Sequence, residues 1–202
     1  TWRFFAEFVG PQDNWLPPDN FQESPAPTLA SRTSPTNIGM ALLANQAAYD
    51  FGYIGAGEFL QRTGNTLAAM EKLERYRGHF YNWYDTHTLQ PLHPQYVSSV
   101  DSGNLAGSLL TLQAGLLELK DRPVLPANMF QGLQDTLQVL AEHVPALPTP
   151  ELAQKIKQLQ NTLDSLAQPV ATANTQPQTL ADADHLLEEM HRIGGSLVAW
   201  LP

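Results

Sequence analysis

Leucine, isoleucine, valine and methionine recur at intervals of three and four residues through much of the chain, a spacing that places apolar side chains on one face of an α-helix. Alternation of apolar and polar residues, which would indicate a strand, never persists for more than a few positions. We therefore expect an all-α fold of six principal helices joined as successive hairpins. The helices are predicted at about residues 35–51, 57–77, 101–119, 129–144, 152–166 and 180–200.

Local signals predict several helix ends. Ser34 is a suitable N-cap, and Pro35 then occupies the first helical position. Gly52 can end that helix in a left-handed conformation, and Gly78 is expected to end the next helix in the same way. Asp101 is interpreted as the N-cap of the third helix, although a cap at the rim of a cleft can also contact a ligand.

Two long connections, residues 9–34 and 78–101, interrupt the helical pattern. Loops longer than about 12 to 15 residues in compact domains are usually functional or disordered. These two are too aromatic to be disordered, so we interpret them as the walls of a cleft. A third connection, residues 168–178, is rich in Pro, Thr, Ala and Gln and is expected to be flexible.

Sixteen of the eighteen aromatic residues lie in the first 96 positions, concentrated in blocks that also hold Asn, Asp and Pro. This mixture suits a carbohydrate site. A ring face packs on the apolar face of a pyranose, while carboxylates and amides pair with its hydroxyls. The alternative is an irregular capping loop with buried rings. The predicted binding residues are Trp15, Asp19, Asn82, Trp83, Tyr84 and Asp101.

Neighbouring side chains cannot all point the same way, so one ring of the Trp83–Tyr84 pair is expected in the core. We choose Trp83 as the stacking ring, with Asp85 on its side of an extended segment. Trp15 and Asp19 are expected to form the opposite wall.

Glycoside chemistry requires two carboxyl groups that face one bond, and Glu23 and Asp85 are the catalytic candidates. Asp19 could equally support Asn20 in a local turn. Arg32 is expected to pair with a carboxylate of its loop.

Composition excludes several classes of function. The chain has 202 residues, no cysteine and a net charge of −9, which argues against thiolate metal sites and nucleic-acid binding. The six histidines form no ligand cluster, and no nucleotide-binding or nucleophile-elbow motif occurs. We expect no metal and no cofactor. No apolar run approaches the length of a membrane span, so the chain itself is expected to be soluble.

Five motifs occur in fixed order: Asn14-Trp-Leu-Pro-Pro-Asp-Asn-Phe-Gln-Glu23, Arg32-Thr-Ser-Pro-Thr-Asn-Ile-Gly39, Asp50-Phe-Gly-Tyr53, Gly78-His-Phe-Tyr-Asn-Trp-Tyr-Asp-Thr86 and Tyr96-Val-Ser-Ser-Val-Asp-Ser-Gly-Asn104. Together they resemble cyclic β-1,2-glucan synthases, and more narrowly the start of their middle, glucoamylase-like region. The resemblance covers about residues 1–120. Residues 121–202 match nothing beyond ordinary helices.

The resemblance implies about half of an (α/α)6 toroid, with the loops of one end forming the cleft. Residues 1–202 are then a single helical fragment of a larger enzyme. It would bind β-1,2-glucan and support its cyclisation by transglycosylation with retention, together with the remaining domains of the parent synthase. The parent is expected at the cytoplasmic face of the bacterial inner membrane.

Two further expectations concern the fragment alone. It should be inactive by itself, because the other half of the toroid is expected to hold the principal carboxylates. Its incomplete helical layer should self-associate through exposed apolar stripes, particularly over residues 129–166 and 180–200. The alternatives to an enzyme fragment are a noncatalytic carbohydrate-binding module and a helical interaction scaffold.

Overall fold

The computed structural model describes residues 2–123 and 126–143, with seven single helical positions at 154, 157, 161, 181, 184, 188 and 191. The helices predicted at 152–166 and 180–200 and the connection predicted at 168–178 therefore lie outside the continuously described residues. The chain divides into two compact units, Thr1–Asp50 with Ile54–Arg122 and Phe51–Tyr53 with Pro123–Pro202.

Helices dominate the described residues, and three pairs of very short antiparallel strands join them. The prediction of a helix-rich fold is confirmed, but a purely α-helical class is too simple. The helices are α1 (Trp2–Phe8), a 3-10 turn (Pro11–Asp13), α2 (Pro35–Asp50), α3 (Ala56–Lys72), α4 (Ser99–Leu119) and α5 (Ala127–His143). The strands are β1 (Phe21–Gln22), β2 (Thr28–Leu29), β3 (Arg32–Thr33), β4 (Arg75–Tyr76), β5 (His79–Phe80) and β6 (Tyr84–Asp85).

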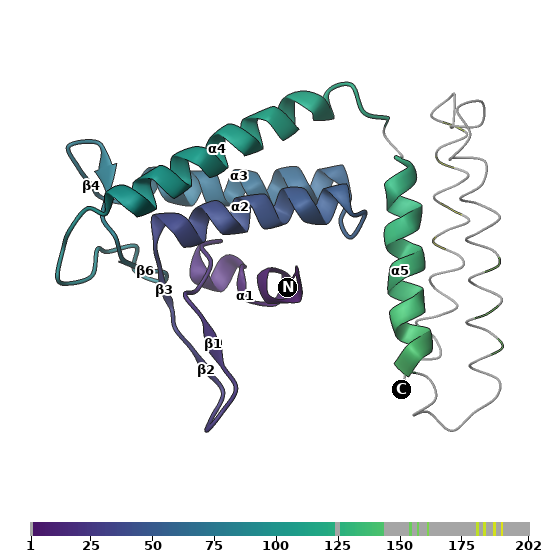
Figure 1. Cartoon of the computed structure of the whole chain (residues 1–202), viewed down its shortest axis with the longest axis horizontal. Coiled ribbons are helices and arrows are strands. Elements are labelled where there is room, and N and C mark those ends of the chain that lie inside the picture. Colours follow the sequence, from purple (N-terminus) through teal and green to yellow (C-terminus); the bar gives the residue numbers. More distant parts are fainter. Residues whose placement is uncertain are drawn as a thin grey trace. The chain divides into compact units, whose positions relative to one another are not determined.

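Within the first unit, α2 packs against both α3 and α4, and the three helices lie side by side in Figure 1. Helices α2 and α4 both begin at the end where β3, β4 and β6 lie (Figure 1). Two glycines allow these helices to approach closely. Gly39 of α2 faces Ser108 of α4, and Gly115 of α4 faces Gln46 of α2. The close packing sets the starts of the two helices next to each other.

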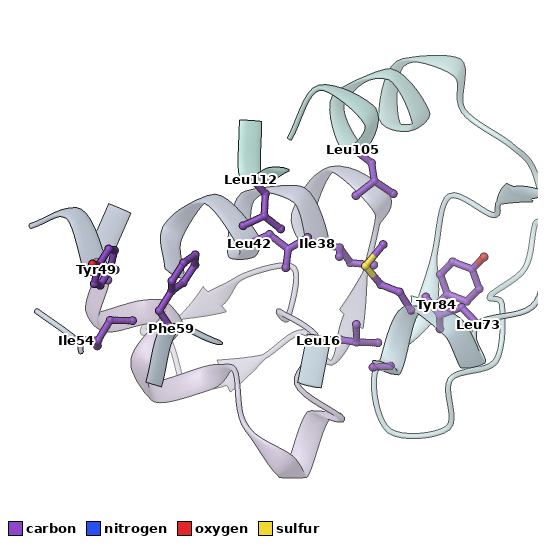
Figure 2. Close-up of a cluster of buried hydrophobic side chains, with 13 residues drawn as sticks. Leu16, Ile38, Leu42, Tyr49, Ile54, Phe59, Leu73, Tyr84, Leu105 and Leu112 are labelled. Carbon is purple, nitrogen blue, oxygen red and sulfur yellow. The ribbon is translucent and has the colours of Figure 1, made fainter. Parts of the chain in front are cut away.

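The core of this unit is a continuous apolar cluster drawn from α2, α3, α4 and the two long connections. Figure 2 shows Ile38, Leu42, Leu105 and Leu112 at its centre, where α2 meets α4. All four side chains are buried. The three- and four-residue spacing of leucines predicted this for Leu105 and Leu112, and it therefore identified the face of α4 that packs on α2.

The predicted start of α2 is confirmed, whereas the predicted end of α3 is wrong. The Asn37 amide donates to Ser34 Oγ at 3.2 Å, so Ser34 is the cap ahead of Pro35. Helix α3 ends at Lys72 rather than at Arg77, and β4 and β5 form a hairpin instead. Arg77 and Gly78 form its two-residue turn, both with positive φ. Gly78 thus serves the hairpin and not the helix.

Helix α1 was missed, and it is attached to the unit through a buried arginine. Arg62 of α3 donates from Nη2 to the carbonyl oxygens of Phe5 at 2.7 Å and Val9 at 3.1 Å, and from Nε to Asn45 Oδ1 at 3.2 Å. Its side chain is buried, and desolvation lowers its pKa while nearby Glu58 raises it. The carbonyls at the end of α1 are thereby satisfied.

In the second unit, α5 confirms the helix predicted at 129–144, and the Phe130 side chain is buried. Gly52 has φ of +72°, which confirms the left-handed conformation expected there. A Cβ atom on Gly52 would collide with the Asn128 backbone, and one on Gly132 would collide with Gly52. The backbone around Gly52 therefore contacts the backbone of α5 directly, and only glycine fits at either position.

Candidate functional site

The two long connections meet at the end of the first unit where α2 and α4 begin. Strand β3 of one connection pairs with β6 of the other, with Arg32 opposite Asp85 and Thr33 opposite Tyr84. Segments that are about fifty residues apart in sequence thus form one surface (Figure 1). The pairing therefore brings Arg32 and Thr33 of the first connection next to Tyr84 and Asp85 of the second.

A second tie between the connections is a buried carboxylate that the sequence analysis did not single out. Asp13 is only 6% exposed and accepts a hydrogen bond from the Thr86 hydroxyl. The same Asp13 oxygen lies 3.1 Å from His87 Nε2. Asn14 Nδ2 donates to the carbonyl oxygens of Thr86 at 2.8 Å and His87 at 3.0 Å. These bonds fix the first connection against the chain just after β6.

Asp19 and Trp83 both contact the guanidinium group of Arg32. Arg32 donates to Asp19 Oδ2 from Nε at 3.2 Å and from Nη2 at 2.9 Å, which confirms the pairing expected for Arg32. Its Cζ atom also lies 4.7 Å from the centroid of the Trp83 ring. Asn37 Nδ2 donates to the other Asp19 oxygen at 3.3 Å. Asp19 thus belongs to the same cluster as Trp83 and not to an opposite wall.

Asp101 is not the helix cap that its sequence context indicated. Ser98 is the N-cap of α4, and its Oγ accepts from the Asp101 amide at 3.2 Å. Helix α4 begins at Ser99, so Asp101 lies within the first turn. Its carboxylate is then available for other partners, and Thr36 Oγ1 donates to Asp101 Oδ1 at 2.7 Å. Asn104 Nδ2 in turn donates to Thr36 Oγ1 at 3.1 Å.

Asn82 connects Trp83 to Asp101. With its amide oxygen toward the Trp83 indole N–H at 2.9 Å and the Tyr96 hydroxyl at 2.7 Å, its nitrogen donates to Asp101 Oδ2 at 2.9 Å. The opposite orientation would set an acceptor against the carboxylate, so the neighbours determine how this buried amide points. Indole, amide and carboxylate therefore form one continuous hydrogen-bonded chain.

The Asp101 carboxylate of this hydrogen-bonded series is held in its ionised form. Burial raises the pKa of Asp101, but hydrogen bonds from Ser98 and Thr36 outweigh that effect, and the pKa lies below its ordinary value. An ionised carboxylate accepts hydrogen bonds and does not donate them. Asp101 is thus suited to accept a hydrogen bond from a hydroxyl group and is poorly suited to donate a proton as a general acid.

Asp85 organises a tight turn after β6. Its Oδ1 accepts from the amides of His87 at 3.0 Å and Thr88 at 2.7 Å, and from the Thr88 hydroxyl at 3.0 Å. The Thr88 amide is the main reason that the pKa of Asp85 is lowered. Three donors on one oxygen commit that oxygen to the local backbone.

Tyr84 lies in the core, as expected for one ring of the pair, whereas Trp83 is half-buried. Figure 2 shows the Tyr84 ring beside Leu73 at one end of the apolar cluster. Its hydroxyl donates to the Glu74 carbonyl oxygen at 2.6 Å, and burial raises its pKa to about 12. A side chain with 0% exposure offers no surface to a sugar. The binding role predicted for Tyr84 is therefore incompatible with its position.

Trp15 and Glu23 lie outside the cluster around Asp101. The Trp15 ring centroid is 5.8 Å from the Arg62 guanidinium, and Thr66 Oγ1 donates to the Trp15 carbonyl oxygen at 2.9 Å, so Trp15 is tied to α3. Glu23 is exposed in the loop between β1 and β2, a hairpin that projects from the helices (Figure 1). The wall predicted from Trp15 with Asp19 is not assembled.

Among the residues that the structure describes, no group of three His, Cys, Asp or Glu side chains could hold a metal ion. Within the same residues, no helix has the length and apolarity needed to cross a membrane.

Comparison with known proteins finds a relative among the cyclic β-1,2-glucan synthases. No family model matches the chain. The chain is 47% identical over 149 residues to the cyclic β-(1,2)-glucan synthase NdvB of Rhizobium meliloti (strain 1021), an alignment that covers 73% of this chain and 5% of that protein's length. A crystal structure assigned as a glucoamylase from Bacteroides fragilis NCTC 9343 has 21% identity and covers 82% of this chain and 32% of its own, with a TM-score of 0.40 that is too low to support an argument. The resemblance to the glucan synthases is thus confirmed, and the chain is homologous to a short segment of a cyclic β-1,2-glucan synthase.

Proposed function

We propose that this chain forms one wall of a glucan-binding cleft in a synthase domain and supports the cyclisation of β-1,2-glucan by transglycosylation. The observation that carries the proposal is the chain of hydrogen bonds from the Trp83 indole through Asn82 to the ionised Asp101. The identity to a cyclic β-(1,2)-glucan synthase supports the choice of ligand. The remaining domains of a larger parent protein would complete the cleft as an (α/α)6 toroid.

The arrangement suits a neutral, polyhydroxylated chain. Arg32 lies over one face of the Trp83 ring, so a sugar would stack on the other face. Asp101 and Asn104 at the start of α4 would then pair with hydroxyl groups. Because the network already fixes the indole and the carboxylate, little conformational entropy is lost when a sugar binds.

In this proposal the principal catalytic carboxylates lie outside the chain. A glycosidic oxygen must be protonated by an acid whose pKa is raised. Asp85 and Asp101 both have lowered pKa values, so neither matches that role. Asp85 would serve as a positioning residue, and the catalytic role predicted for Glu23 stays a prediction. The chain alone is accordingly expected to form no cyclic product.

A noncatalytic carbohydrate-binding module is the second candidate. The same lowered pKa values favour it, because hydroxyl-binding acceptors are useful without any acid. The synthase proposal also places the parent protein at the cytoplasmic face of the inner membrane. The binding-module proposal makes no statement about location. Both candidates bind glucan, whereas a helical scaffold does not.

Isothermal titration of the chain with linear β-1,2-glucan tests the proposal. Wild-type protein should bind, and Trp83→Ala should weaken binding by about 1 to 3 kcal/mol, the scale of losing an aromatic contact. Trp2→Phe is the matched control, because Trp2 contacts Arg62 rather than the cluster. Equal affinity of Trp83→Ala and wild type would refute the site, and no binding by wild type would favour the scaffold.

A further inference from the structure

A hollow of about 370 Å³ lies beside the Asn82 network and has no role in the site described above. Tyrosine rings from two segments line most of it. Tyr76 comes from β4, Tyr81 follows β5, and Tyr96 precedes α4. Gln95 and Val97 complete the lining. Its volume is within the range of small-molecule sites.

The rings of the hollow are held in place by contacts behind them. The Tyr81 ring packs edge-on against the buried Tyr84 ring at 6.4 Å, and the Tyr81 amide donates to the Tyr84 hydroxyl at 2.7 Å. Tyr96 is fixed twice, since its carbonyl oxygen accepts from the Asn82 amide at 2.8 Å and its hydroxyl donates to the Asn82 side chain. Arg77 lies 5.4 Å from the Tyr76 ring centroid. The Tyr81 and Tyr96 side chains of the hollow are thus positioned before any ligand arrives.

The lining carries no charged side chain. Three aromatic rings offer flat apolar faces, and the exposed Gln95 amide offers both a donor and an acceptor. A charged ligand would find no counter-ion among these five residues. A pyranose matches both features, because its C–H face is apolar and its rim consists of neutral hydroxyl groups.

We propose that this hollow is a second subsite, which binds a glucosyl unit of the same glucan chain that stacks on Trp83. The inference rests on the proposed function and extends it to residues to which no role was assigned. Asn82 links the two subsites, because its amide oxygen accepts from both the Tyr96 hydroxyl of the hollow and the Trp83 indole N–H, and its nitrogen donates to Asp101. A long oligosaccharide spans both subsites, whereas a disaccharide occupies the Trp83 subsite alone.

Titration of the intact chain with a linear β-1,2-linked glucose hexasaccharide and with the disaccharide tests this subsite. Tyr76→Ala should weaken hexasaccharide binding by about tenfold and leave the disaccharide within about twofold. Tyr76 is 51% exposed, so its truncation spares the core. Val97→Lys, which fills the hollow, should give the same selective loss if Tyr76→Ala is poorly folded. Tyr53→Ala, an exposed tyrosine outside the lining, should change neither affinity.

The outcomes separate this inference from the function on which it rests. If Trp83→Ala weakens both ligands while Tyr76→Ala and Val97→Lys weaken neither, the hollow is no subsite and the proposed function stands. Equal losses for both ligands in Tyr76→Ala also overturn the subsite, because they would show that the two sugars share one position. If wild type binds neither ligand, the proposed function fails and the subsite fails with it.

Discussion

Replacement of Asp101 by asparagine tests the hydrogen-bonded chain that joins α4 to Trp83. The new side chain has nearly the same shape, but one of its two acceptor oxygens becomes a donor. If the oxygen faces Thr36, then the new NH₂ group faces the Asn82 NH₂ group. Asn82 could turn over to accept from it, but its NH₂ group would then face the Trp83 indole N–H. The new side chain could instead turn over, so that its NH₂ group donates to Thr36 Oγ1 and its oxygen accepts from Asn82, but the Thr36 hydroxyl proton then loses its acceptor. Each of the three arrangements leaves one donor without its partner, and none keeps a charged acceptor.

The expected cost follows from the number and kind of bonds. Asp101 accepts one bond from Thr36 and one from Asn82, and bonds to a charged group contribute about 1.5 to 3 kcal/mol each. Asp101 is only partly buried, so solvent reduces these values. We expect Asp101→Asn to lower the free energy of unfolding by about 1 to 2 kcal/mol.

Urea unfolding followed by tryptophan fluorescence measures this difference. Asp121→Asn is the matched control, because Asp121 is an exposed carboxylate just beyond the other end of α4. The control should stay within about 0.5 kcal/mol of wild type. If Asp101→Asn matches the control in stability, the carboxylate does not organise the network, and the account of Asn82 is incorrect.

Three further variants or conditions address the supporting structure. Gly39→Ala would place a Cβ atom 2.6 Å from Ser108 Oγ. The resulting overpacking should cost about 1 to 3 kcal/mol and should exceed the gain in helix propensity of about 1 kcal/mol. A higher free energy of unfolding in urea would contradict the close packing of α2 on α4. Ser98→Ala should lower the free energy of unfolding by about 1 kcal/mol in the same assay, and an unchanged value would indicate that Asp101 is the N-cap instead. Lowered pKa values of Asp85 and Asp101 stabilise the fold above the ordinary value of 3.8, and that stability is lost as pH falls through the lower folded values. Acid titration of wild type should therefore show a steeper loss below about pH 4 than titration of Asp101→Asn, and parallel curves would contradict this sign.

The sequence predicted well where a local signal decides the structure. The cap at Ser34 and the left-handed Gly52 depend on a few adjacent residues, and both are confirmed. The two rings of the Trp83–Tyr84 pair also separate as expected, because successive residues of an extended strand point to opposite faces. The core face of α4 follows from the spacing of its leucines in the same way.

Errors arose where tertiary contacts decide between local alternatives. Ser98 and Asp101 are both good capping residues, and the sequence does not tell which one the first turn uses. Helix α3 could have continued past Lys72 by propensity, but the Tyr84 hydroxyl binds the Glu74 carbonyl oxygen and the chain turns into a hairpin. The link through Asn82 joins Trp83 to Tyr96 and Asp101, which lie much further along the same connection, so no local pattern could reveal it.

The fluorescence of Trp83 alone tests the central claim most directly. Phenylalanine replaces the other three tryptophans, Trp2, Trp15 and Trp200, so that all emission comes from Trp83. Addition of linear β-1,2-glucan should then produce a saturable shift in emission, because the sugar covers the indole face opposite Arg32. The midpoint should agree with the dissociation constant from calorimetry. A calorimetric binding signal without any change in Trp83 emission would place the glucan elsewhere and contradict the account.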